Sequence, residues 1–450
     1  MNILALLQCL QPYLSTTDLR HLSRIVQAML SMTGRVTMLG ISRWAGKGGS
    51  YRSVQRFFNA TIPWPKVFVK FFAQHLYRPT GEYFLVGDES VVTKSGKKTH
   101  GLDYFFSGLL SKTVKGIAIF ALSLVSVEER RSYPLQVEQV VRSEAEKAVA
   151  KARKKKRQAK KKSASKKKPG RPKGSKNRDK TQVELTPELK RIQKMVKKQL
   201  AALRNLVSVR YLALDGHFGN NNALQMVRQC GLQLISKLRH DAALYFIYDG
   251  KQKCKGPRKK YGQKINYQRI PEKYLVEQST QGDICTRIYQ AVMLHPDFAQ
   301  TLNVVIITKT NLKTGAFANV NLFSSDLELP YEKIVDFYSL RFQIEFNFRD
   351  AKQFWGLEDF MNVKEIPLTN AFNLALFMVN LSQVLLCDLR QTIPESSILD
   401  LKAYFRAAKY FQETIKMLPQ KPEPILLEQI FGQVASLGCI HYVNVRVPSP

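Results

Sequence analysis

The order of hydrophobic patterns between residues 83 and 214 is the feature that most restricts the fold of this chain. Apolar segments with strand-like spacing predict strands at 83–92, 101–110 and 115–127. A helix is expected from residue 186 to about residue 206, with a proline at its first helical position. The next strand is expected at 207–214. This order predicts an α/β fold, a mixed sheet flanked by helices, that begins with a three-stranded antiparallel meander.

The charge of the chain restricts its partners. The sequence holds 70 Lys and Arg against 35 Asp and Glu, a formal net charge of +35. This excess is larger than solubility requires and indicates a polyanion: DNA, RNA or an anionic membrane. A membrane span needs about 18 consecutive apolar residues, whereas the longest apolar stretch, 371–387, contains polar residues and is predicted to be a core helix. We therefore expect nucleic acid and no membrane as partner, and a cytoplasmic, nucleoid-associated location, since no export signal is recognised.

Residues 1–78 are predicted to form a helical DNA-binding domain. A cap-like sequence at 15–18 precedes an apolar stripe with helical spacing. The segments 40–46 and 50–58 suit a helix-turn-helix-like unit with arginines along one side. A helical cap with solvated arginines explains the same residues, because this motif carries little sequence signal.

A lysine-rich run interrupts the predicted fold. Residues 151–180 hold 17 Lys and Arg and one acid, Asp179. The net positive charge of this segment is nearly half of the net charge of the whole chain. Such a segment is too charged to fold alone, so a basic disordered insertion is expected at 140–183. Its sequence Lys-Pro-Gly-Arg-Pro-Lys-Gly resembles an AT-hook, in which Arg171 would enter the minor groove of A·T-rich DNA. A solvated linker that binds phosphates indiscriminately is the alternative.

The second half of the chain returns to strands and ends in helices. A basic loop with predicted strands at 243–248 and 286–294 indicates a β-rich insertion. Strands at 302–308 and 318–323 follow, and helical patterns continue from residue 331 to the end. The expected regions are a core in two parts, 79–237 and 301–362, a β-rich insertion, 238–300, and a helical C-terminal region, 363–450.

Two aspartates close predicted buried strands. Asp88 follows 84–87, and Asp215 follows 211–214. A carboxylate at the end of an apolar strand is costly to desolvate unless a divalent cation compensates it. Each aspartate alone could be an ordinary turn residue. Alternation places Glu89 on the opposite side of the strand from Asp88, and His217 is treated as structural.

Four residues of the helix predicted from residue 331 share one face. Tyr338, Arg341, Glu345 and Lys352 stand at offsets of 0, 3, 7 and 14, which at about 100° per residue fall within roughly 60°. A face of this composition is not a core stripe. The apolar side of the helix is expected to consist of Ile334, Phe337, Phe342 and Phe346.

This Tyr-Arg-Glu-Lys spacing resembles the signature helix of the insertion-sequence-4 family of bacterial transposases. The resemblance extends over residues 83–360, and the order of the first strands is that in which the RNase H-like fold begins. It implies a Mg²⁺-dependent DDE transposase on an RNase H-like core, with Mn²⁺ expected to substitute. Carried over residue by residue, the catalytic and metal-binding triad is Asp88, Asp215 and Glu345.

The chemistry of these residues agrees with that implication. Three carboxylates carry about −3, and two Mg²⁺ ions about 3.5–4 Å apart would neutralise them and activate a water or 3′-hydroxyl for in-line attack on a phosphate. The DNA-binding residues of the helix would be Arg341, as a bidentate phosphate ligand, Lys352, as a point charge, and Tyr338, which would bond a phosphate or stack.

Three functions remain open from the sequence. The first is a cut-and-paste transposase that binds double-stranded DNA at terminal inverted repeats and at a target, as a homodimer, because two ends must be cut and joined together. The second is an RNase H-like structure-specific nuclease, and the third is a non-catalytic DNA-binding protein derived from a transposase. Arg341 and Lys352 favour the first over the second, and the intact triad argues against the third.

Overall fold

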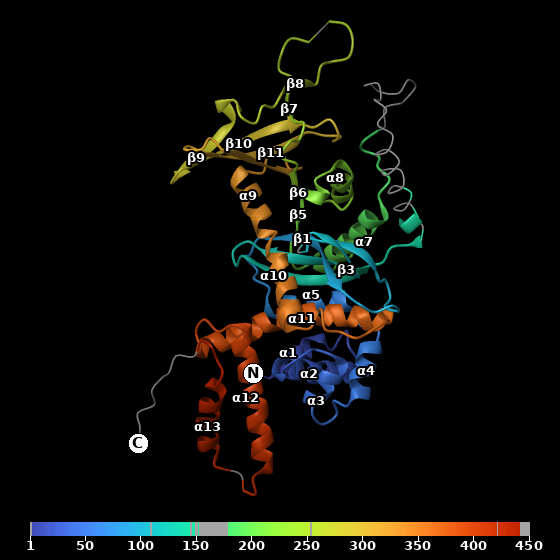
Figure 1. The fold of residues 1–450 in the computed structure, drawn as a ribbon, viewed down its shortest axis with the longest axis vertical. Helices are drawn as coiled ribbons and strands as arrows, with labels where there is room; N and C mark the ends of the chain where they lie inside the picture. The colour runs from blue at the N-terminus through green and yellow to red at the C-terminus, as the bar shows by residue number, and fades with distance from the viewer. Residues whose placement is uncertain are drawn as a thin grey trace.

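The computed structural model describes residues 2–108, 110–144, 146–148, 152, 179–252, 254–420 and 422–441. Within these ranges twelve strands form one sheet, with the N-terminal and C-terminal helices at one end of the molecule and β7–β11 at the other (Figure 1). Two strand pairs, β1–β5 and β5–β6, are parallel and the remaining pairs are antiparallel. The predicted α/β class, a mixed sheet flanked by helices, is confirmed. Most of the predicted basic insertion, including Arg171, lies outside the described residues.

The N-terminal region is helical, as the sequence predicts. The side chains of Ser15, Thr37 and Ser50 each accept a hydrogen bond from a backbone N–H three residues ahead, and so begin α2, α3 and α4. Arg43, on α3, and Arg52, on α4, are exposed. The elements are α1 (Ile3–Leu7), the short turn η1 (Gln8–Leu10), α2 (Thr16–Ser31), α3 (Met38–Trp44), α4 (Tyr51–Asn59) and α5 (Trp64–His75).

The first four strands are arranged around β3 (Lys112–Ser126). The whole length of β1 (Tyr83–Thr93) pairs with one edge of β3. β2 (Asp103–Ser107) and β4 (Arg131–Val140) share the other edge of β3. The predicted meander is therefore wrong in its order, because β1 and β2 each pair with β3 and not with one another. The strand β4 has no counterpart among the predicted strands.

The parallel part of the sheet begins where β5 (Tyr211–Leu214) enters beside β1. The predicted helix before it is observed as α7 (Pro187–Leu203), capped by Thr186 with a proline in its first turn. All four residues of β5 are buried, and β6 (Gln233–Leu238) pairs with its other edge. The connections are the turn η2 (Gly216–Phe218) and α8 (Asn221–Arg228).

The sheet continues into the predicted β-rich region. β12 (Phe317–Ser324) pairs with β6, β11 (Leu302–Asn311) pairs with β12, and β10 (Ile284–Leu294) pairs with β11. The strands predicted between residues 243 and 323 are therefore present, and they form an extension of the same sheet. The remaining elements of this extension are β7 (Tyr245–Ile247), β8 (Tyr261–Lys264), η3 (Glu272–Tyr274) and β9 (Leu275–Gln281).

The helix predicted from residue 331 is interrupted. It consists of α9 (Tyr331–Leu340) and α10 (Gln343–Phe354), and between them the N–H groups of Phe342 and Glu345 bond to carbonyls three residues back, a tightened turn. The predicted apolar side is wrong at Phe342, which is 47% exposed. Ile344 and Phe348 are buried instead, because the tightened turn rotates α10 relative to α9.

Of the C-terminal helices, α11 covers the sheet. α11 (Glu365–Thr392) is long and apolar enough to cross a membrane. However, 78% of its most apolar 18-residue segment is buried within the protein, as is common for a core helix. Asn380 of α11 donates a hydrogen bond to the Pro134 carbonyl of β4, and α5 and α10 pack beside it (Figure 1). α12 (Ile398–Met417) and α13 (Pro424–Ser436) form a helical hairpin that projects from this layer (Figure 1).

Candidate active site

Parallel pairing of β1 and β5 brings Asp88 and Asp215 side by side. The ladder ends at the pair Gly87 and Leu214, so the next residue of each strand is one of the two aspartates. Neighbouring strands are about 5 Å apart, which sets the separation at which the two side chains begin. The prediction that Asp88 closes its strand is wrong, because β3 continues to pair with β1 as far as Thr93. Asp88 instead marks the point where the pairing with β5 ends.

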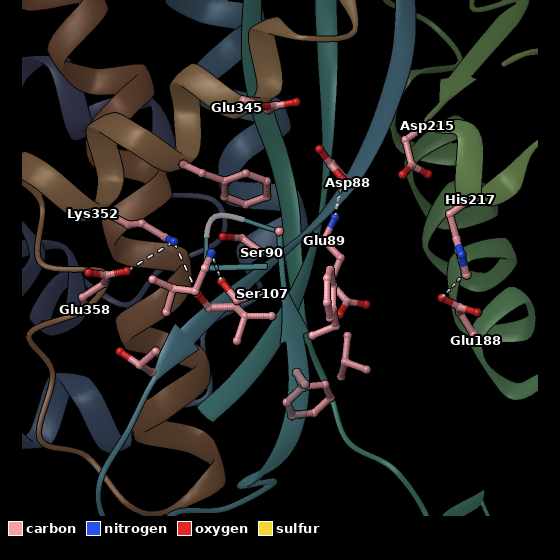
Figure 2. Close-up of a pocket in the computed structure, with 18 of the residues that line it drawn as sticks. Asp88, Glu89, Ser90, Ser107, Glu188, Asp215, His217, Glu345, Lys352 and Glu358 are labelled. Atoms are coloured by element: carbon pink, nitrogen blue, oxygen red, sulfur yellow. Dashed lines mark hydrogen bonds and ion pairs between the residues drawn. The ribbon is translucent and has the colours of Figure 1, made fainter. Parts of the chain in front are cut away.

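Both aspartates and Glu345 line one large cavity. Figure 2 shows Asp88 on β1, Asp215 after β5 and Glu345 on α10 at the same end of this cavity. Its volume is about 1130 Å³, above the roughly 300–1,000 Å³ of small-molecule sites. Residues more than 250 positions apart in the chain therefore meet in one cavity that is larger than a typical small-molecule site.

Asp88 is a largely desolvated carboxylate. Its side chain is 21% exposed, Oδ1 accepts a hydrogen bond of 2.8 Å from the backbone N–H of Glu89, and Oδ2 lies 3.4 Å from Nη1 of Arg341. Desolvation by burial raises the pKa of Asp88 to about 6, although Arg341 acts in the opposite direction. The negative charges of Asp215 and Glu345 contribute to the same rise. The carboxylate thus lacks enough positive charge around it.

Asp215 carries an unsatisfied oxygen. Its Oδ1 is buried and has no hydrogen-bond partner, while its backbone carbonyl accepts a bond of 2.8 Å from the Ser236 hydroxyl. A buried carboxylate oxygen without a partner is costly. A divalent cation between Asp88 and Asp215 would compensate both residues, because oxygen ligands of this kind are those that Mg²⁺ binds. The chemistry of the pair fits a metal ion.

Glu345 reaches the site from the other side. Its side chain is 42% exposed, and Oε1 lies 3.5 Å from Nη2 of Arg341. Two residues later the buried Asn347 donates a hydrogen bond of 2.8 Å to the Ser132 hydroxyl on β4, which fixes α10 against the sheet. Arg341, only 12% exposed, therefore lies between Asp88 and Glu345 and bridges them.

The three carboxylates converge without forming a closed cluster. Across the described ranges, no group of three or more His, Cys, Asp or Glu side chains is close enough to hold a metal ion. The guanidinium of Arg341 occupies the position between Asp88 and Glu345. Asp88 and Asp215 offer carboxylate oxygens of the kind that a divalent cation binds, whereas Glu345 has Arg341 as its partner.

The other two residues of the predicted face lie beside the site. The Tyr338 ring packs under the guanidinium of Arg341, 5.6 Å from its centre, and burial raises the pKa of Tyr338. Lys352 lines the cavity, donates a hydrogen bond of 3.3 Å to the Val91 carbonyl and forms an ion pair of 3.2 Å with Glu358 (Figure 2). All four residues of the predicted face are thus within one neighbourhood, each already in contact with protein groups.

A second group of polar residues, to which the sequence assigned no catalytic role, lies in the same cavity. Glu89 lines it too, although the unbroken register of β1 with β3 keeps Asp88 and Glu89 on opposite faces of the strand, as alternation predicts. His217 and Glu188 lie 3.7 Å apart beside Asp215 (Figure 2). This contact with Glu188 raises the pKa of His217 and lowers that of Glu188. Glu188 could not be found from the sequence, since in the helix it reads as an ordinary first-turn acid.

A family model described as DDE superfamily endonuclease matches residues 6–291, more than half of the chain. The chain belongs to this family. It is therefore an enzyme of the DDE nuclease and transposase type, for which the family implies a DNA substrate. The match includes Asp88 and Asp215 and ends before Glu345. No curated protein matches the chain.

Proposed function

We propose that this DDE endonuclease is a transposase that binds the ends of a mobile element, cleaves them and joins them to target DNA. The observation that carries the proposal is the convergence of Asp88, Asp215 and Glu345 on one cavity, with a buried oxygen of Asp215 left without a partner. The finer assignment is to the insertion-sequence-4 group with an RNase H-like core, and it rests on the Tyr338, Arg341, Glu345 and Lys352 spacing.

Asp88, Asp215 and Glu345 would hold the metal, Mg²⁺ or, in its place, Mn²⁺. When bound, such an ion supplies Lewis-acid activation of a water or 3′-hydroxyl and neutralises charge on the scissile phosphate. The chain itself contributes the walls of the cavity and positive side chains beside it. Arg341 and Lys352 each have an anionic partner that a phosphate would have to replace or join.

DNA binding away from the cavity is assigned to the basic parts of the chain. The net charge of +35, the exposed arginines of α3 and α4, and the lysine-rich run with Arg171 support a sequence-independent grip on phosphates. Pairing and joining two ends requires two active sites, so a homodimer is part of the proposal. The proposed location is the cytoplasm, on the nucleoid.

The test is cleavage of DNA from both flanks of the coding region by purified protein in Mg²⁺. Asp88→Asn, Asp215→Asn and Glu345→Gln should each abolish strand cleavage, because each removes a metal ligand, while DNA binding in a gel assay stays the same or tightens slightly. Glu89→Gln is the matched control, since Glu89 is a neighbouring carboxylate in the same cavity, and it should retain cleavage.

Two outcomes would change the assignment. Cleavage by any one triad variant would remove that residue from the metal site, and loss of cleavage in Glu89→Gln with retention in Glu345→Gln would exchange the two. Cleavage of flank DNA without any joining product would favour a structure-specific nuclease, the function that the word endonuclease in the family description supports.

A further inference from the structure

One exposed aromatic surface borders the cavity and has no role in the reaction described so far. Tyr104 and Phe106, on the edge strand β2, are 61% and 66% exposed. They are two residues apart on one strand, so both side chains stand on the same face. Large aromatic side chains are rarely left this open in pairs, because each ring loses the free energy of burial.

The strand that carries these rings is held firmly on its other face. Phe105 is 1% exposed, and the guanidinium of Arg142 packs over its ring at 4.4 Å from the ring centre. Arg142 also forms an ion pair of 3.5 Å with Asp103 and donates a hydrogen bond of 2.9 Å to the Tyr104 carbonyl. The open rings are therefore presented by an anchored strand.

The position of the rings relates them to the carboxylates. Phe106 lines the same cavity as Asp88 and Glu345. Tyr104 is two residues before Phe106 on β2. On the paired strand β3, Lys115 stands opposite Tyr104 and Lys112 opposite Ser107. By this register Tyr104 is closer than Phe106 to the level of the pair Asp88 and Ala121, and Lys112 points to the other face with Ser107. A DNA strand leaving Asp88 along the sheet would meet Tyr104, then Phe106, with Lys115 beside its phosphates.

We propose that this β2–β3 surface, made of Tyr104, Phe106 and Lys115, is a stacking platform for unpaired DNA bases next to the cleavage site. Aromatic rings interleaved with lysines bind single strands because every base has a flat face, whereas in a duplex those faces are covered by neighbouring bases. The backbone positions of the two residues are about 6.8 Å apart along the strand, roughly twice the rise per base. The proposal rests on the proposed function in taking DNA as the substrate.

The experiment measures binding of the full chain, in EDTA, to a labelled oligothymidylate and to a blunt duplex of equal length. Tyr104→Ala/Phe106→Ala should weaken oligothymidylate binding by about tenfold or more, because stacking on each ring is lost. Duplex binding should change by less than about twofold, since the lysines and the rest of the basic surface remain. Phe106→Trp should restore most of the single-strand affinity in the Tyr104→Ala background.

Tyr410→Ala is the matched control, because Tyr410 is a similarly exposed tyrosine, 56%, on the distant helix α12. It should bind both probes as the unmodified chain does. Equal oligothymidylate binding by the double variant and the unmodified chain would overturn the platform, and so would an equal loss for both probes. A change of native mass without a change in oligothymidylate binding would assign the surface to a second copy of the chain and also overturn it.

Failure of the platform is distinct from failure of the proposed function. If the unmodified chain cleaves flank DNA in Mg²⁺ and the double variant keeps its oligothymidylate affinity, only the platform is wrong. If the unmodified chain binds neither probe and cleaves no DNA, the function itself is wrong and the platform falls with it.

Discussion

Replacement of Arg341 by Met tests whether this arginine compensates the carboxylates of the site. Arg341 is 12% exposed and bridges Asp88 at 3.4 Å and Glu345 at 3.5 Å. Met keeps most of the side-chain volume but removes the positive charge. The carboxylates would then lack their nearest cation, and we expect the protein to lose stability in the absence of divalent metal.

The magnitude follows from the exposure of each partner. The contact with Asp88 is a partly buried charge-assisted interaction worth about 1.5–3 kcal/mol, and its length of 3.4 Å places it in the lower half of that range. The contact with Glu345, whose side chain is 42% exposed, is screened and adds less than about 1 kcal/mol. The free energy of unfolding of Arg341→Met should therefore be about 2 kcal/mol lower at pH 8.

The loss should disappear at lower pH. The pKa of Asp88 is about 6 in the folded protein, above its usual value of 3.8, so its ionised form costs stability, and that cost is complete only above pH 6. Removal of Arg341 raises the pKa of Asp88 further. Below pH 6, however, Asp88 is mostly protonated in both folded proteins, so its contribution to stability there is the same in each. The two proteins should therefore differ little at pH 5 and diverge as the pH rises above 6.

Urea denaturation in EDTA at pH 5 and pH 8, followed by tryptophan fluorescence, measures the difference. Arg349→Met is the matched control. Arg349 is on α10, forms an ion pair of 2.9 Å with Asp350, and has a side chain that is 59% exposed. This control should lose less than about 1 kcal/mol at both pH values. An equal loss for Arg341→Met at pH 5 and pH 8 would refute the electrostatic role and leave only packing.

Two further predictions concern other parts of the chain. Deletion of residues 151–180, with 17 Lys and Arg, should flatten the slope of log DNA affinity against log salt, because fewer counterions are released; an unchanged slope would show that the run does not touch DNA. Gly87→Ala should destabilise the protein by about 1–3 kcal/mol in urea denaturation, since an added Cβ would lie 2.6 Å from the buried Phe120 ring. An unaltered denaturation midpoint would show that the ring moves freely.

Hydrophobic patterns were sufficient to predict the strands that carry the aspartates. The run 84–87 and the run 211–214 are continuously apolar, and both are buried in the sheet. The helix α7 was equally clear from its proline and its spacing. Parallel pairing of β1 and β5 then brings Asp88 and Asp215 together, so the first two residues of the site follow from local sequence and one topological step.

Other features depend on pairing that local sequence does not show. β4 has apolar residues in alternation at Tyr133, Leu135 and Val137, but Pro134 stands among them, and a proline inside a run argues against a central strand. It is a strand because β3 pairs with it, and Pro134 is accommodated at an irregularity of register opposite Ser123. Likewise, Glu89 lines the cavity from the face of β1 opposite to Asp88, which no pattern in the local sequence indicates.

The position of Arg341 shows the limit most clearly. A guanidinium binds a carboxylate and a phosphate with the same fork of donors, so a polar helix face cannot tell which anion it meets. With its two terminal nitrogens on Asp88 and Glu345, Arg341 cannot also grip a phosphate bidentately, and the two arrangements are alternatives for one side chain. The tightened turn at Arg341–Phe342 helps to decide between them, because it sets the direction of α10 and thus the distance between Arg341 and Glu345. No proline or glycine marks that turn, and for this reason spacing alone predicted one continuous helix with Arg341 free for DNA.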